Sequence, residues 1–244
     1  MHEQNIAHRY ARMLLLDTLG CLTRVSFLRD CTANNIMLDP SGMYPDGFHP
    51  VKINRSRDFK NKLQRFDRTQ RPPRYYLIDF GLSRQYSSRN AIDNPLRGGD
   101  KSAPEHQIGR RCNPFQTDIY HLGNLVRERF IRVTVFEICF FACAHRIIQK
   151  YNGFGFIKDL VDAMTAVEPS KRPTIEEVIA KFARIRESLS VAKLRSPITS
   201  SRDSSVITAF RYTSQAIRTV QYIILQKPAI PEPNPNHIDV MALS

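Results

Sequence analysis

Hydrophobic residues recur along this chain with two different spacings, and the changes between them divide it into elements. Spacing of three or four residues predicts helices over residues 1–28, 115–131, 156–167 and 175–189. Two short uninterrupted apolar runs, residues 36–38 and 75–78, predict strands. The pattern therefore indicates a mainly helical chain with two short strands.

Polar and turn-forming residues separate these elements. Residues 40–50 read as a loop, and residues 79–114 as an irregular segment rich in Gly, Ser, Pro and charge. Beyond residue 189 the chain carries a Ser-rich run and then Pro-Glu-Pro-Asn-Pro. That composition predicts a loosely ordered tail over 190–244, apart from an apolar island at 216–225.

Composition excludes several classes of protein. The 244 residues are 42% hydrophobic and 24% charged, which is enough apolar material for a packed core. The first residues lack the pattern of a secretory signal, and the longest apolar stretch, 133–148, is broken by Glu137, His145 and Arg146. The five cysteines are scattered and form no disulfide framework. We expect no membrane segment and a cytoplasmic or nuclear location.

Three short motifs follow one another in a fixed order. Arg29-Asp30-Cys31-Thr32-Ala33-Asn34-Asn35 fits R-D-x-x-x-x-N, Asp79-Phe80-Gly81 follows an apolar strand, and Ala103-Pro104-Glu105 comes next. Two further matches are D-x-x-x-x-G at 118–123 and Glu-Pro-Ser-Lys-Arg-Pro-Thr at 168–174. In this order the motifs resemble the C-terminal lobe of eukaryotic protein kinases, including kinase-like proteins of fungi, over roughly residues 29–189.

The resemblance implies an α+β, protein-kinase-like fold over 1–189, with a mainly helical C-lobe, short strands at the cleft and the tail 190–244. It implies ATP- and Mg²⁺-dependent transfer of the γ-phosphate to a protein hydroxyl, serine or threonine rather than tyrosine. Asp30 would be the catalytic base, and Asn35 and Asp79 would hold Mg²⁺ and, through it, the nucleotide. Residues 79–105 would be the activation segment, closed by a buried Glu105–Arg172 ion pair.

The chain departs from the family at several places. No glycine-rich loop or lysine-bearing strand precedes the catalytic loop, so we expect the ATP-holding N-lobe to be missing and activity to be impaired. Thr32 stands where serine/threonine kinases usually carry a lysine, so the sequence does not decide which type of hydroxyl group accepts the phosphate. The alternative is a catalytically inactive kinase-like scaffold or gene fragment.

Three stretches look inserted, near 10–29, 40–74 and 132–148. Without 10–29, the residues His8-Arg9 would run directly into Asp30 to give H-R-D. We hypothesise that 10–29 and 132–148 are retained introns; the alternative is a genuine, divergent pair of helices. Sequencing the mature transcript separates the two.

The net charge of +13 is concentrated in one of these inserts. Residues 52–74 hold nine Lys or Arg and two Asp, and nine minus two gives +7. Such a run indicates a solvated face that could dock an acidic partner. A third reading of the protein is a nucleic-acid binder acting through 52–74, but local concentration of the charge does not favour nucleic acid as a partner. The expected partners are a protein substrate and, if an N-lobe is supplied, ATP; no membrane partner is expected.

Overall fold

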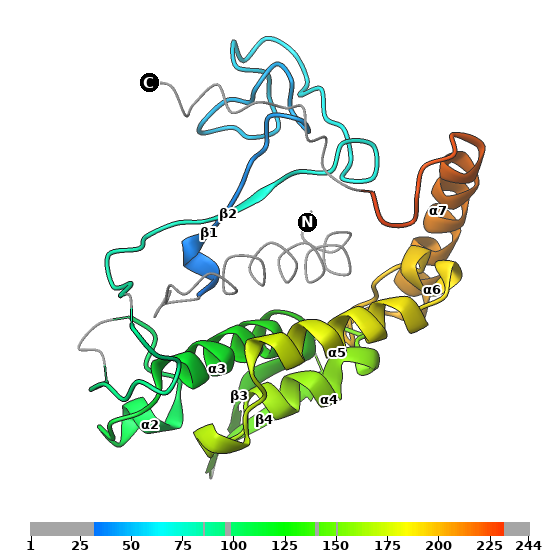
Figure 1. Ribbon diagram of the computed structural model, residues 1–244. Helices are drawn as coiled ribbons and strands as arrows, with labels where there is room; N and C mark the ends of the chain where they lie inside the picture. Colours follow the sequence, from blue (N-terminus) through cyan, green and yellow to red (C-terminus); the bar gives the residue numbers. More distant parts are fainter. Residues whose placement is uncertain (1–31, 85, 96–98, 140–141, 150, 232–244) are drawn as a thin grey trace.

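A computed structural model describes residues 32–84, 86–95, 99–139, 142–149 and 151–231 (Figure 1). In these residues, helices combine with two antiparallel two-stranded sheets, which is an α+β arrangement. The helix predicted over 1–28 and the 10–29 insert lie outside the described residues. So does Asp30.

The first sheet joins two segments that are far apart in the sequence. A short 3₁₀ turn, η1 (Ala33–Asn35), leads into β1 (Ile36–Leu38), which pairs antiparallel with β2 (Tyr75–Leu77). Both predicted strands are confirmed, and β2 ends one residue earlier than expected. Ile36 lies opposite Leu77, and Leu38 lies opposite Tyr75. The 40–74 insert therefore leaves from one end of this sheet. Residues 35 and 79 lie at the opposite end of the sheet.

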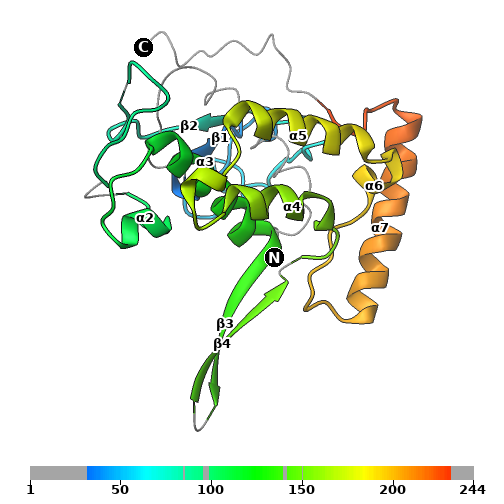
Figure 2. The same ribbon diagram turned by 60° about the horizontal axis from the view of Figure 1, so that its bottom comes forward.

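Three helices form the main hydrophobic layer, and all three match predictions. They are α3 (Pro114–Val126), α4 (Gly155–Met164) and α5 (Ile175–Ser188), with α3 continued by a π-helical turn, η2 (Arg127–Ile131). Both views show them packed beside one another (Figures 1 and 2). Their facing sides, together with Phe154 just before α4, bury the core side chains Leu122, Val126, Ile157, Val161, Met164 and Val178.

Local sequence sets where two of these helices begin. The Asn113 side chain accepts a hydrogen bond from the Phe115 amide at 2.9 Å, and Pro114 occupies the first turn. At α5, Thr174 and Glu177 form a reciprocal capping box. Each cap satisfies amide groups that a helix start leaves unpaired. These signals explain why the predicted and observed starts differ by one residue at most.

Gly123 lets α3 and α4 approach closely. A Cβ at position 123 would lie 2.7 Å from Met164 Cβ and 2.9 Å from Thr165 Cγ2. We therefore expect Gly123→Ala to lower the free energy of unfolding by about 1–3 kcal/mol through overpacking. Urea denaturation measures the change. The matched control is Gly155→Ala in α4, where a Cβ meets nothing within 4 Å; equal losses in both variants would contradict the close-packing explanation.

The 132–148 insert is not helical. Residues 132–149 form an antiparallel hairpin of β3 (Arg132–Cys139) and β4 (Ala142–Gln149), so the alternative that this stretch is a helix is wrong. The run Val133-Thr134-Val135-Phe136 is β-branched and aromatic, which favours an extended backbone over a helix. The hairpin projects away from the helical layer (Figure 2).

The tail beyond residue 189 is more ordered than its composition predicts. It forms α6 (Val191–Arg195) and a 20-residue helix, α7 (Ser205–Ile224), which corrects the expectation of a loosely ordered segment. Ser190 and Ser204 cap the two helices through their hydroxyl oxygens. Ser204, which belongs to the Ser-rich run that suggested disorder, thus acts as a helix cap. No helix among the described residues combines the length and apolarity that a bilayer crossing requires.

The 40–74 insert contains no regular helix or strand. Met43 and Thr69 are buried in it, and Asp67 accepts hydrogen bonds from the amides of Thr69 and Gln70 at 2.7 and 3.0 Å. Most of its basic side chains face solvent, including Lys52, Arg55, Arg57, Lys60, Lys62 and Arg65. Within the described part of the chain, no carboxylate forms an ion pair with any of these six.

Candidate functional site

The two predicted metal-holding residues lie at the same end of the β1–β2 sheet. The amide of Ile78 donates to the carbonyl oxygen of Asn35 at 2.9 Å, which extends the ladder by one step beyond the strands. Asp79 follows Ile78 directly, so the backbones at 35 and 79 are neighbours although 44 positions separate them. Antiparallel pairing of two short strands is therefore what brings these residues together.

The two side chains have different surroundings. Asn35 is 9% exposed and Asp79 is exposed. One Asp79 carboxylate oxygen, Oδ1, accepts a weak hydrogen bond from the Gly81 amide at 3.4 Å. The carboxylate is thus open to a cation, whereas the Asn35 amide lies within the protein.

Asp79 also has an uncommon backbone conformation. Its φ is 60°, in the left-handed region that favours glycine. Aspartate tolerates this region better than most residues, yet such conformations carry strain and gather at functional sites. The conformation of Asp79 is one of three positive-φ values among the described non-glycine residues, with those of Phe59 and Gln226.

The structure does not place the predicted catalytic base, because Asp30 lies just outside the described residues. The first described residue, Thr32, precedes η1 in an extended conformation, and its carbonyl oxygen accepts from the Asn35 amide at 3.1 Å. Among the described residues, only Asn35 and Asp79 of the predicted site are therefore brought together. The role of Asp30 stays a prediction.

The segment that follows Asp79 is held to the helical layer by pairing at Asp93. The amide and carbonyl of Asp93 exchange hydrogen bonds with those of Cys112 at 2.9 and 3.0 Å. The Tyr86 hydroxyl donates to Asp93 Oδ2 at 2.5 Å. Farther along, Asn113 donates to the Arg89 carbonyl oxygen at 2.7 Å, and Arg89 forms an ion pair with Glu176 on α5. These contacts position the segment against the helices.

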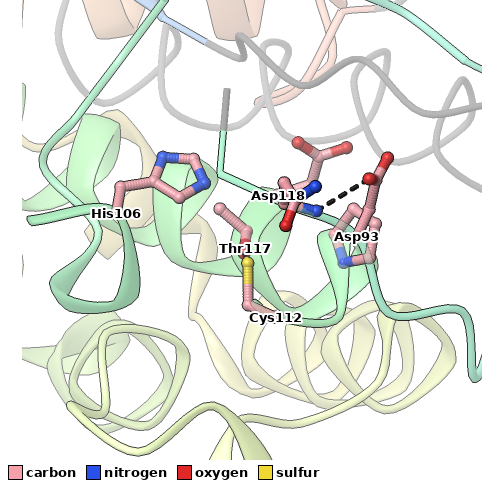
Figure 3. A pocket seen from close by; sticks show the side chains of 7 residues that line it. Asp93, His106, Cys112, Thr117 and Asp118 are labelled. Atoms are coloured by element: carbon pink, nitrogen blue, oxygen red, sulfur yellow. Dashed lines mark hydrogen bonds between the residues drawn. The ribbon is translucent and has the colours of Figure 1, made fainter. Parts of the chain in front are cut away.

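A small pocket lies where this segment meets the start of α3 (Figure 3). Its wall includes the backbone-paired residues Asp93 and Cys112, His106 from α2 (Pro104–Gln107), and Thr117 and Asp118 from α3. Asp118, the first residue of the D-x-x-x-x-G motif, is only 2% exposed. The family resemblance implies that Asp118 braces the backbone amides of the catalytic loop, residues 30–35, but Asp30 and Cys31 lie outside the described residues, so this role stays a prediction.

Glu105 and Arg172 form a buried ion pair. Arg172 Nη1 and Nη2 donate to Glu105 Oε1 and Oε2, both at 2.7 Å, in a two-pronged geometry. Their side chains are 2% and 0% exposed. Arg172 also donates to the carbonyl oxygens of Ala166 at 2.8 Å and Gln116 at 3.0 Å, and the Thr117 hydroxyl donates to Glu105 at 2.8 Å. The contact expected from the resemblance is present.

These partners determine the ionisation of Glu105. Burial alone raises the pKa of this carboxyl, but the hydrogen bonds from Arg172 and Thr117 and the Arg172 charge outweigh burial and lower the pKa to about 2. Glu105 is therefore a carboxylate at neutral pH. The pair ties α2, at the end of the irregular segment, to the turn η3 (Pro169–Lys171) that precedes α5.

Sequence reasoning missed several residues of this region. Asp93, His106 and Thr117 matched no motif, because their roles depend on contacts between segments that are distant in sequence. His106 packs edge-to-face on buried His121, with ring centroids 5.6 Å apart. A signal was available only for Asn113, whose place before Pro114 and an apolar helix is typical of an N-cap.

Comparison with known proteins adds no assignment: the chain matches neither a protein-family model nor a curated protein. The functional conclusion therefore depends on the motifs and on the geometry described above.

Proposed function

We propose that this chain carries the metal-binding half of a protein-kinase-like active site, which transfers the γ-phosphate of ATP to a protein hydroxyl. The observation that carries the proposal is the Ile78–Asn35 hydrogen bond, which makes the D-F-G motif a neighbour of the end of the R-D-x-x-x-x-N motif. Two motifs that fit phosphoryl transfer separately are adjacent in space. The buried Glu105–Arg172 pair also supports the proposal, because it joins two further motifs, Ala-Pro-Glu at 103–105 and Glu-Pro-Ser-Lys-Arg-Pro-Thr at 168–174.

The donor atoms at this end of the sheet fit Mg²⁺. Asp79 supplies carboxylate oxygens and Asn35 an amide oxygen, which are hard ligands, and Mg²⁺ completes its shell with water and substrate phosphates. When bound, the ion would neutralise charge on the phosphates during transfer. Asp79 would hold it through the exposed carboxylate, and Asn35 would contribute after its side chain turns toward the sheet end. Asp30, five residues before Asn35, would orient the acceptor hydroxyl and take its proton.

A catalytically inactive scaffold is the second candidate function. The burial of Asn35 beside an exposed Asp79 favours it, because the two ligands do not share one solvent-facing surface. In that case the helical layer and its ion pair would serve as a docking platform, without chemistry at the sheet end.

Nucleotide binding to the full chain separates the two functions. Because the N-lobe motifs are missing, we expect weak ATP binding that depends on Mg²⁺ at the sheet end, measurable by calorimetry, with affinity reduced more than about tenfold in Asp79→Asn. Asparagine tolerates the left-handed backbone, so this substitution removes the charge with little strain. The matched control is Asp46→Asn, an exposed aspartate in the insert, which should bind as the wild type does. Absence of Mg²⁺-dependent binding by the wild-type chain would reject the enzyme and favour the scaffold.

A further inference from the structure

Helix α7 packs against the protein through its polar side. Gln215 Nε2 donates to the Arg195 carbonyl oxygen at 2.9 Å, and Arg211 forms an ion pair with Asp203 at 3.0 Å. Tyr222, the buried residue of this helix, hydrogen-bonds through its hydroxyl to Asp67 of the 40–74 insert. The usual arrangement of a surface helix, apolar side inward, is therefore reversed.

The reversal leaves an apolar stripe facing outward. We call Val206, Phe210, Thr213, Ile217, Val220 and Ile224 the outer face of α7. Its five large apolar members are 57–78% exposed. A contiguous apolar surface of this kind indicates an interaction site, and α7 stands at the edge of the molecule, where a partner can reach it (Figures 1 and 2).

The spacing along the outer face indicates a helical partner. Its positions follow one another at intervals of four, three, four, three and four residues, which is the heptad spacing of helices that pair lengthwise. The positions that flank the stripe carry no charge: they are Ile207, Ala209, Ser214, Ala216, Gln221 and Ile223. An uncharged seam does not require an oppositely charged partner, and it approaches its own copy without local repulsion.

We propose that the outer face of α7 is a homodimer interface, in which two copies of the helix pair antiparallel. In this orientation one register matches the whole stripe: Val206 faces Ile224 of the second copy, Phe210 faces Val220, and Thr213 faces Ile217. The largest side chain then opposes a small one, which fills space evenly. Antiparallel alignment also pairs the opposite ends of the helix dipoles.

The exposed apolar area is of the size that a dimer needs. If the outer face were fully covered together with Ile207, Ile223 and the C-cap residue Leu225, which are also exposed, it would bury on the order of 800 Å², about what one partner contributes to a standard interface. The remaining charge of each copy is strongly positive and opposes association at a distance. Added salt screens that repulsion, so it should strengthen the dimer, whereas it would weaken binding to an acidic protein or to nucleic acid.

Analytical ultracentrifugation of the full chain tests the proposal. Between about 1 and about 100 µM we expect a monomer–dimer equilibrium in the wild type, tighter at about 0.5 M NaCl than at about 0.05 M. Val220→Lys should weaken the dimer more than about tenfold, because the charge would be buried in an apolar seam. The matched control, Val167→Lys, changes an exposed valine outside α7 and should dimerise as the wild type does. A wild-type chain that stays monomeric, or a Val220→Lys variant that dimerises normally, overturns the proposal.

A cross-linking experiment tests the orientation. Thr213→Cys and Ile217→Cys variants are oxidised separately and as a mixture, with the wild-type chain giving the background from its native cysteines. The antiparallel register predicts disulfide-linked dimers in the mixture at a level that neither variant reaches alone. Cross-linking that is as efficient within each variant as between them contradicts the antiparallel arrangement. The proposal does not depend on the function proposed for the sheet end.

Discussion

Arg172→Ala should lower the free energy of unfolding by about 3–5 kcal/mol, because it leaves the Glu105 carboxylate buried without its partner. The loss is a large share of the total stability of a typical domain, about 5–15 kcal/mol. The three carbonyl oxygens that Arg172 also contacts, on Ala166, Gln116 and Val167, would lose a donor as well. Urea denaturation followed by circular dichroism measures the change.

The neighbouring residue provides the control. Lys171 pairs with Glu168 at 3.0 Å, but both side chains are more than half exposed, so solvent screens the interaction. Lys171→Ala should therefore leave the denaturation midpoint almost unchanged. If Lys171→Ala and Arg172→Ala lowered the free energy of unfolding by similar amounts, the buried ion pair would not be the cause. The effect would then come from the backbone of the turn before α5.

Acid should destabilise the protein through the same carboxylate. The pKa of Glu105 is about 2 in the folded chain against an ordinary value of 4.5. A carboxyl with a lowered folded-state pKa stabilises the fold above its unfolded-state pKa and loses that contribution as pH falls toward the folded-state pKa. The difference corresponds to about 3 kcal/mol, lost between pH 4.5 and about 2. Denaturation midpoints measured across this range give the slope.

The Arg172→Ala variant separates Glu105 from the other carboxylates. Without the arginine, burial dominates and raises the pKa of Glu105, so protonation in acid would favour the folded chain instead of opposing it. The loss of stability between pH 4.5 and about 2 should accordingly be smaller in the variant than in the wild type. An equal loss in both chains would assign the acid sensitivity to other groups.

Predictions from the sequence were most accurate where a short local pattern determines the structure. The strands at 36–38 and 75–78 are bounded by polar residues, and the helix starts at Pro114 and Ile175 follow strong caps, so these elements lie where expected. The motifs also led directly to Glu105 and Arg172, whose contact no local pattern requires.

Predictions were wrong where they relied on the overall composition of a segment and not on the positions of its individual residues. Serines near residue 200 suggested disorder, although Ser204 begins the longest described helix. For the insert at 132–148, the alternative to a retained intron was a divergent helix, although its β-branched residues favour strands. The requirement for glycine at position 123 could not be predicted, because a side chain there becomes too large only when α4 packs closely against α3 in the folded chain. Likewise, nothing local marks Asp93 as the partner of Cys112.

The β1–β2 pairing has a consequence for how the protein opens. Only three residue pairs join the strands, and the whole 40–74 insert forms the loop between them, so few backbone hydrogen bonds close a long loop. The sheet is held to the core mainly by Tyr75, Ile36, Leu38 and Leu77. The helical layer, by contrast, is built from helices with a shared apolar core. We therefore expect the sheet to open more readily than the helices, which would separate residues 35 and 79 while α3, α4 and α5 stay folded. The pairing that assembles the candidate site would be among the first to be lost on warming, well before the chain as a whole unfolds.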